Sequence, residues 1–154
     1  MSKSDWIWMP HAGHFILSDK CRFHLNTYLP SGYIVSTVGE LWNERAVRDI
    51  HAEVVDPIWY GENRDFKGDI YDAAFMKKFG FQDIGYNRKY ETMVFKAKKN
   101  HDPKWQCCPY EAVIGQDVDM DGYNTGVEAF KGHTEMCEKW EKELLVTPEQ
   151  ERGE

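Results

Sequence analysis

The last third of the sequence holds residue types that bind transition metals. Cys107 and Cys108 precede a segment in which His133 and Cys137 stand four residues apart. On a helix, this spacing places both side chains on one face. Thiolate and imidazole ligands suit tetrahedral zinc, and four of them make a closed, structural site. We therefore predict zinc at Cys107, Cys108, His133 and Cys137, and the alternative is a core Cys137, a surface His133 and a buried cysteine pair.

A second cluster of ligand types lies near the N-terminus, where His11 and His14 are followed by Cys21 and His24. The spacing is H-x-x-H and then, after six residues, C-x-x-H. On a regular strand, Cys21 and His24 fall on opposite faces, which favours a polar loop followed by one histidine on a strand face. Either cluster could lend a ligand to the other, so a mixed site is a further alternative.

The stretch D-V-D-M-D-G, followed by five residues and a glutamate, matches the calcium loop D-x-[DN]-x-[DN]-G-x5-E. In such a loop, carboxylates at alternate positions converge on one ion, a glycine makes the sharp turn, and the glutamate completes the shell. The stretch resembles an EF-hand loop over these twelve residues only. The predicted calcium ligands are Asp117, Asp119, Asp121 and Glu128, and the alternative is an acidic turn before a helix start.

The clearest local pattern is a hairpin. Residues 21–29 alternate, and the turn at 30–32 leads into a β-branched run over 33–38. One face of the first strand carries Phe23, Leu25, Thr27 and Leu29. The other face is polar and predicts a surface that binds an anionic or nucleotide-like ligand, or a solvated sheet face. Its residues are Arg22, His24, Asn26 and Tyr28.

Periodicity predicts two packing helices, over about 44–55 and 69–79, and a C-terminal helix that Asn124 or Thr125 opens and that reaches about Leu145. We expect Val127 and Phe130 on the apolar side of the C-terminal helix. A second hairpin is predicted to join 81–84 to 90–97. The predicted fold is α+β, with a mostly antiparallel sheet of two hairpins, two packing helices and a C-terminal helix.

Residues 72–85 and 90–95 carry a known pattern: a helix that ends in K-x-G-F and is followed by a hairpin. This block resembles the C-terminal half of GNAT-type N-acyltransferases, and the resemblance covers residues 33–97. It implies an acyltransferase with coenzyme A as cofactor. The segment 38–45 lacks the paired glycines of the family's phosphate-binding loop, and no catalytic residue is assigned. The whole chain also resembles small uncharacterised bacteriophage or prophage proteins.

The 154 residues carry a formal net charge of −7, and this charge is unevenly distributed. Residues 101–154 hold 5 basic and 13 acidic side chains, a net charge of −8, whereas residues 1–100 are nearly neutral. The length predicts a single domain over 1–146, with an α+β body (1–100), an acidic appendage pinned by the metal (101–146) and a disordered tail (147–154). The acidic balance argues against direct nucleic-acid binding.

The sequence contains no apolar run long enough to span a membrane, and its first residues do not form a signal peptide, so the expected compartment is the cytoplasm. These features favour a small phage-type accessory protein that acts by binding, with a structural zinc site and a protein partner. One alternative is an enzyme, either a reduced GNAT-like acyltransferase or a metal-dependent hydrolase. Another is an acidic inhibitor that mimics nucleic acid.

Overall fold

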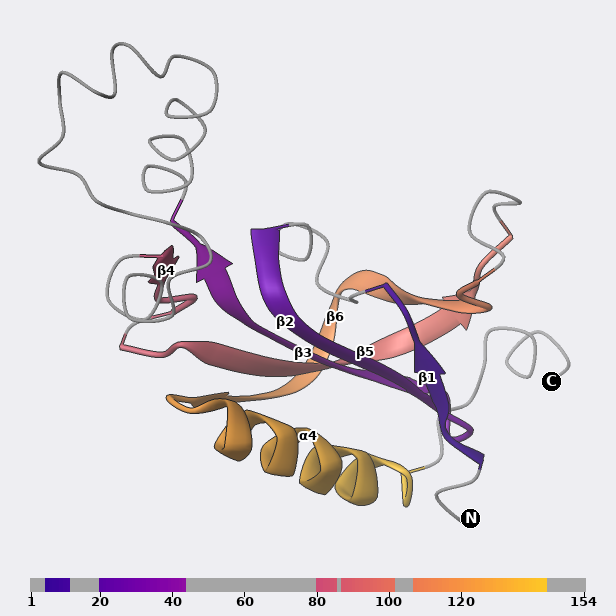
Figure 1. Cartoon of the computed structure of the whole chain (residues 1–154). Coiled ribbons are helices and arrows are strands. Elements are labelled where there is room, and N and C mark those ends of the chain that lie inside the picture. Colours follow the sequence, from indigo (N-terminus) through magenta and orange to yellow (C-terminus); the bar gives the residue numbers. More distant parts are fainter. Residues whose placement is uncertain (1–4, 12–19, 44–79, 86, 102–106, 144–154) are drawn as a thin grey trace, which may run out of the picture.

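The computed structural model describes residues 5–11, 20–43, 80–85, 87–101 and 107–143. In this part of the chain, an antiparallel sheet lies against one helix (Figure 1). The elements are β1 (Ile7–Met9), β2 (Cys21–Leu29), β3 (Tyr33–Trp42), β4 (Phe81–Gln82), β5 (Tyr90–Lys99), β6 (Tyr110–Tyr123) and α4 (Gly126–Trp140). The strand order is β1-β2-β3-β5-β6, and β4 pairs with β3. The α+β class with a mostly antiparallel sheet is confirmed.

The first hairpin has the predicted strands and turn. Leu29 pairs with Tyr33, and the Gly32 N–H donates to the Leu29 carbonyl at 2.9 Å. Gly32 has φ +98°, a conformation that glycine adopts without steric cost. β3 extends beyond the predicted run to Trp42 and pairs with β2 over most of its length.

The second predicted hairpin pairs differently. β5 forms at the predicted place, but β4 pairs with the end of β3 (Trp42 with Phe81) rather than with β5. β3 pairs with both strands. Its first part, from Tyr33 to Gly39, pairs with β5, and its last two residues pair with β4. Glu40, with φ +54°, interrupts the ladder between the two partners. Because β3 is ten residues long, both β4 and β5 can pair with it. This arrangement gives more hydrogen bonds than pairing β4 with β5 alone.

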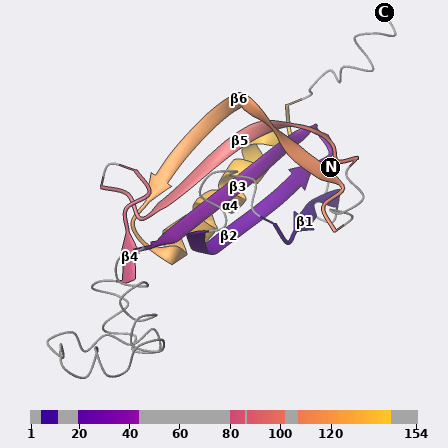
Figure 2. The same ribbon diagram turned by 90° about the horizontal axis from the view of Figure 1, so that it is seen from above.

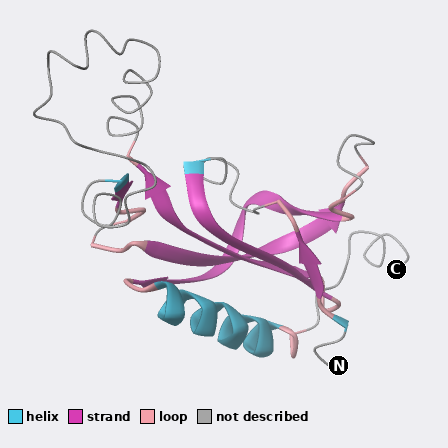
Figure 3. Ribbon diagram, in the orientation of Figure 1, coloured by secondary structure: helices cyan, strands magenta, loops and turns pink. Residues whose placement is uncertain are grey.

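Strand alternation divides the sheet into two faces. The face toward α4 contains a core of Trp6, Leu29, Tyr33, Val35, Val94 and Cys137, with Met136 and Trp140 packed against it. The opposite face carries a separate cluster with Met9, Ile34 and Cys108. In Figure 3, α4 covers only one side of the sheet. Side chains from neighbouring positions of β3, such as Ile34 and Val35, therefore belong to different cores.

The C-terminal helix begins where the sequence predicts. The Thr125 hydroxyl accepts a hydrogen bond from the Glu128 N–H and donates to the Glu128 carboxylate, both at 3.1 Å. This reciprocal cap satisfies a backbone donor that the helix itself leaves unpaired. The expected apolar side of the helix needs correction, because Val127 and Phe130 are 81% and 55% exposed. The buried positions are Ala129, Gly132, His133 and Cys137.

The two predicted packing helices, at 44–55 and 69–79, lie outside the described residues, as does the predicted tail at 147–154. In the part of the chain that is described, no helix is long and apolar enough to cross a membrane.

Removing the Thr125 hydroxyl tests the cap. We expect Thr125→Ala to lower the free energy of unfolding by about 1 kcal/mol, because the Glu128 N–H loses its acceptor. Thr125→Ser keeps the hydroxyl and is the matched control, with a loss well under half as large. Urea unfolding measures both, and equal losses in the two variants would contradict a role for the hydroxyl.

Candidate metal centre

Three potential ligands meet on the face of the sheet opposite α4. His11 Nδ1 lies 3.3 Å from Cys108 Sγ and 3.3 Å from Cys107 Sγ. The nearest ligand atoms of the three side chains all lie within 4.8 Å of one another. Two atoms bound to one tetrahedral zinc, at about 2.0 Å for nitrogen and 2.3 Å for sulfur, are about 3.5 Å apart. The spacing therefore fits an ion held between the imidazole and the two sulfurs.

Separate elements position the histidine and the cysteines of this cluster. His11 follows β1, whose last residue, Met9, belongs to the same buried cluster as Cys108. The Cys108 carbonyl accepts a hydrogen bond from the Asn100 side chain at 3.0 Å, and the Asn100 N–H donates to the Pro109 carbonyl. Cys108 is consequently fixed, whereas Cys107 is exposed.

Curvature of the sheet brings these segments together. β2 and β6 are separated by two strands in the sheet order, yet the rings of Tyr28 and Tyr110 stack with centroids 3.6 Å apart. Figure 2 shows the start of β6 near β1, at the opposite end of that order. The long strand β6 therefore folds back over the sheet and carries the two cysteines toward His11.

Protonation opposes metal binding at Cys108. Burial raises the pKa of this thiol, and the neighbouring Cys107 raises it further, while a hydrogen bond from the His11 backbone opposes both effects. A zinc ion reverses this balance because a coordinating thiol loses its proton. Metal affinity at this cluster should therefore increase with pH.

The four-ligand prediction is corrected in two of its members. His133 is fully buried under α4, and its Nε2 and Nδ1 lie 2.9 Å and 2.7 Å from the hydroxyls of Thr27 and Thr37. Cys137 is part of the core between α4 and the sheet. Cys107 and Cys108 lie on the other side of the sheet, so the strands separate the two halves of the predicted site. The expectation of a surface His133 is also wrong.

The N-terminal cluster is likewise divided. His11 joins the two cysteines, and His14 lies outside the described residues. Cys21 packs with Val38 and Leu41, and burial raises the pKa of its thiol to about 11. His24 is exposed. A mixed site, with His11 from the N-terminal cluster and the two cysteines from the C-terminal one, is the combination that the described residues bring together.

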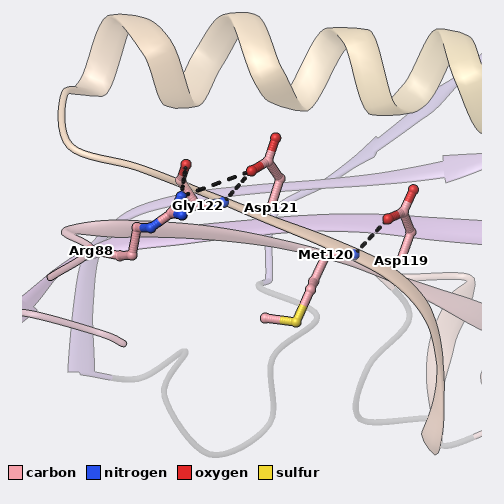
Figure 4. Close-up of polar contacts among 5 residues, drawn as sticks. All are labelled: Arg88, Asp119, Met120, Asp121 and Gly122. Carbon is pink, nitrogen blue, oxygen red and sulfur yellow. Dashed lines mark hydrogen bonds and ion pairs between the residues drawn. The ribbon is translucent and has the colours of Figure 1, made fainter. Parts of the chain in front are cut away.

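The predicted calcium loop is a β-strand. Asp117, Asp119 and Asp121 alternate along β6, and residues two apart on a strand are about 6.6 Å apart, too far for carboxylates to converge on one ion. Figure 4 shows Asp119 and Asp121 on the side of β6 nearer α4, with Met120 on the other side. Glu128 instead belongs to the cap of α4.

Each of two aspartates in β6 has a local role. Asp119 accepts hydrogen bonds from Lys139 at 2.7 Å and from the Trp140 indole at 2.9 Å. Partial burial opposes ionisation of Asp119, but these donors and the Met120 N–H lower its pKa overall. Asp121 accepts from the Gly122 N–H at 2.8 Å and lies 3.9 Å from Arg88. These contacts attach α4 and the turn before β5 to β6.

The predicted ligand-binding face is largely engaged within the protein. Arg22 pairs with Glu40 at 2.9 Å, and this hydrogen bond is the main cause of the lowered pKa of Glu40. Tyr28 stacks on Tyr110. The Asn26 amide donates to the His11 carbonyl, while its buried Oδ1 accepts no hydrogen bond from the described residues. One residue of the predicted face, Asn26, therefore helps to hold the segment that carries His11.

Comparison with protein-family models, curated proteins and solved structures found no match to this chain. The acyltransferase resemblance, with coenzyme A, and the resemblance to phage proteins therefore stay predictions. Much of the acyltransferase block, residues 44–79, lies outside the described residues.

The pairing of His11 with the cysteines has no local signal in the sequence. The partners are 96 and 97 residues apart, and no motif spacing connects them. The available hint is the mixed site that the sequence leaves open, in which one cluster lends a ligand to the other.

Titration of His133 should make stability depend on pH. Burial lowers the pKa of His133 to about 4, from 6.5 in an exposed histidine. Between these two pKa values the unfolded chain therefore binds a proton that the folded protein does not. The free energy of unfolding is highest above pH 6.5 and decreases as the pH falls toward 4. At pH 5 the loss is about 2 kcal/mol.

Urea unfolding of metal-free protein at pH 7.5 and pH 5 measures this effect. We expect His133→Gln to show a smaller difference between the two pH values than the wild-type protein, by about 2 kcal/mol. His24→Gln, in which an exposed histidine is replaced, should keep the wild-type difference. A His133→Gln variant with an unchanged pH difference would show that the buried imidazole does not titrate in this way.

Proposed function

We propose that this protein binds zinc, and that His11, Cys107 and Cys108 hold the ion. The observation that carries the proposal is the convergence of one imidazole and two sulfurs that are 96 and 97 residues apart in the sequence. Cysteine and histidine together are the usual ligands of zinc in proteins. Both nitrogen-to-sulfur distances, 3.3 Å, are close to the spacing that one bound ion requires.

In this proposal the ion has a structural role as a cross-link, with water in the fourth tetrahedral position that the three ligands leave open. It joins the segment after β1 to the segment before β6, and so links the two strands at opposite ends of the sheet order. Loop-closure entropy is large for contacts so distant in sequence, so a metal cross-link here restricts the unfolded chain strongly. The protein would then act by binding a partner, a role supported by exposed large apolar side chains such as Trp8 and Phe130.

Metal analysis of the purified full-length chain tests the assignment. We expect about one zinc per chain in the wild-type protein, with at least tenfold weaker binding in His11→Ala and in Cys107→Ser, because each removes a ligand. Both side chains are exposed, so neither change disturbs a core. Substitution with Co²⁺ gives an independent reading, since a thiolate-to-metal absorption band appears only when sulfur binds the ion.

Matched controls separate the site from general effects. His24→Ala removes an exposed histidine of β2, and Cys21→Ala removes a thiol from a different cluster. Both should retain wild-type zinc. If His24→Ala lowers zinc as much as His11→Ala does, or if no variant lowers it, the ion is not held by this cluster.

Removing the metal should reduce thermal stability. With free zinc at a hundred times the dissociation constant, binding stabilises the fold by about 2.7 kcal/mol. For a chain of this length, this amount corresponds to a melting temperature about 5–10 °C higher. Differential scanning calorimetry with and without a chelator measures the shift. At the same free zinc, tenfold weaker binding in Cys107→Ser leaves about 1.4 kcal/mol, so its chelator shift should be about half the wild-type shift or less. A chelator effect of equal size in that variant would contradict the proposal.

A further inference from the structure

The two cysteines of the metal centre differ in their access to solvent. Cys107 is exposed, and Cys108 is buried with Met9 and Ile34. Their sulfurs both lie 3.3 Å from the same nitrogen, His11 Nδ1, and therefore on one side of the chain. A small oxidant that reaches Cys107 consequently finds a second thiol adjacent to it.

We propose that Cys107 and Cys108 form a site of reversible oxidation, in which a peroxide joins the two sulfurs in a disulfide and releases the bound metal. The release of metal rests on the proposed zinc function, whereas formation of the disulfide does not. Two of the three proposed metal ligands, the sulfurs of Cys107 and Cys108, are then also the pair that is oxidised.

The reaction proceeds in two balanced steps. The Cys107 thiolate attacks one oxygen of hydrogen peroxide, the O–O bond breaks, and a sulfenic acid forms while the departing hydroxide takes up a proton to become water. The Cys108 sulfur then attacks the sulfenic sulfur, the S–O bond breaks, and the second hydroxide also becomes water. Two cysteine sulfurs are oxidised by two electrons in total, and peroxide is reduced to two waters.

Formation of the disulfide removes two of the three metal ligands. A sulfur that bonds to another sulfur no longer carries the thiolate charge that binds zinc. His11 alone then remains of the three ligands, and a single imidazole does not retain the ion against solvent. One zinc should therefore be released for each disulfide formed.

Geometry makes this disulfide easy to reduce. Adjacent α-carbons are about 3.8 Å apart across a trans peptide, below the usual 4.4–6.8 Å range for a disulfide. The resulting strain raises the reduction potential, and strained disulfides are the labile ones. A cellular thiol such as glutathione should restore both cysteines, and the site can then bind metal again.

The remaining cysteines are unsuitable partners for Cys107. Cys137 is fully buried in the core on the opposite side of the sheet. Cys21 lies in a third cluster with Val38 and Leu41, where burial raises the pKa of its thiol to about 11 and keeps it protonated. Cys108 is the thiol that the fold places within reach of Cys107.

The experiment treats the zinc-loaded full-length chain with one equivalent of hydrogen peroxide. Free thiols are then alkylated under denaturing conditions, and intact mass and peptide mapping identify the oxidised residues. A chromogenic chelator follows the released zinc. We expect a chain that takes up two alkyl groups where the fully reduced chain takes up four, with a Cys107–Cys108 linkage, one zinc released per disulfide, and full reversal by dithiothreitol.

Variants keep the outcomes distinct. Cys107→Ser should form no disulfide with Cys108, while His24→Ala should behave as the wild-type protein. If metal-free wild-type protein forms the linkage but never bound zinc, the proposed function fails and the oxidation site stands. Sulfinic acid as the first stable product, linkage of Cys107 between two chains, or earlier oxidation of Cys21 or Cys137 would each overturn the inference.

Discussion

A buried imidazole determines how the helix lies on the sheet. His133 projects from α4 and contacts Thr27 of β2 and Thr37 of β3, and Thr37 also lies 2.6 Å from Thr92 of β5. Three central strands and the helix thus share one hydrogen-bonded network without access to water. A shift of the helix along the strands would leave these buried groups unpaired, at a cost of about 1–3 kcal/mol for each group. The network therefore holds the helix in this position.

The position of the helix also decides where cysteine chemistry can occur. Side chains alternate along β3, so Tyr33 and Val35 pack under α4 while Ile34 faces the other side and packs with Cys108. Cys137 therefore serves as an apolar side chain in the first core. The metal centre depends instead on the second face, where β6 curves back and its Tyr110 stacks on Tyr28. Two residues of the same type have different roles because one sheet separates them.

Local patterns in the sequence predicted the elements that local forces determine. The alternation of residues 21–29, the turn before Tyr33 and the Thr125 cap are all in place, because each depends on neighbours within a few residues. Pairing partners were predicted less well. β4 pairs with β3 instead of β5, and His11 meets residues nearly a hundred positions away. Such contacts depend on sheet order and curvature, which short-range periodicity does not encode. Half of the predicted metal ligands were therefore assigned to the wrong face.

The aspartate stretch shows how one pattern can suit two structures. Alternating Asp117, Asp119 and Asp121 match a calcium loop, but a period of two is also that of a strand. β6 is an edge of the sheet in the described chain, and its exposed backbone could pair with another molecule. Here the Met120 and Gly122 N–H groups donate to aspartate carboxylates, and Arg88 donates to the Gly122 carbonyl at 2.6 Å (Figure 4). The aspartates that suggested an ion site thus accept hydrogen bonds from backbone N–H groups that a strand of another molecule would need for pairing. This protects the edge from unwanted pairing.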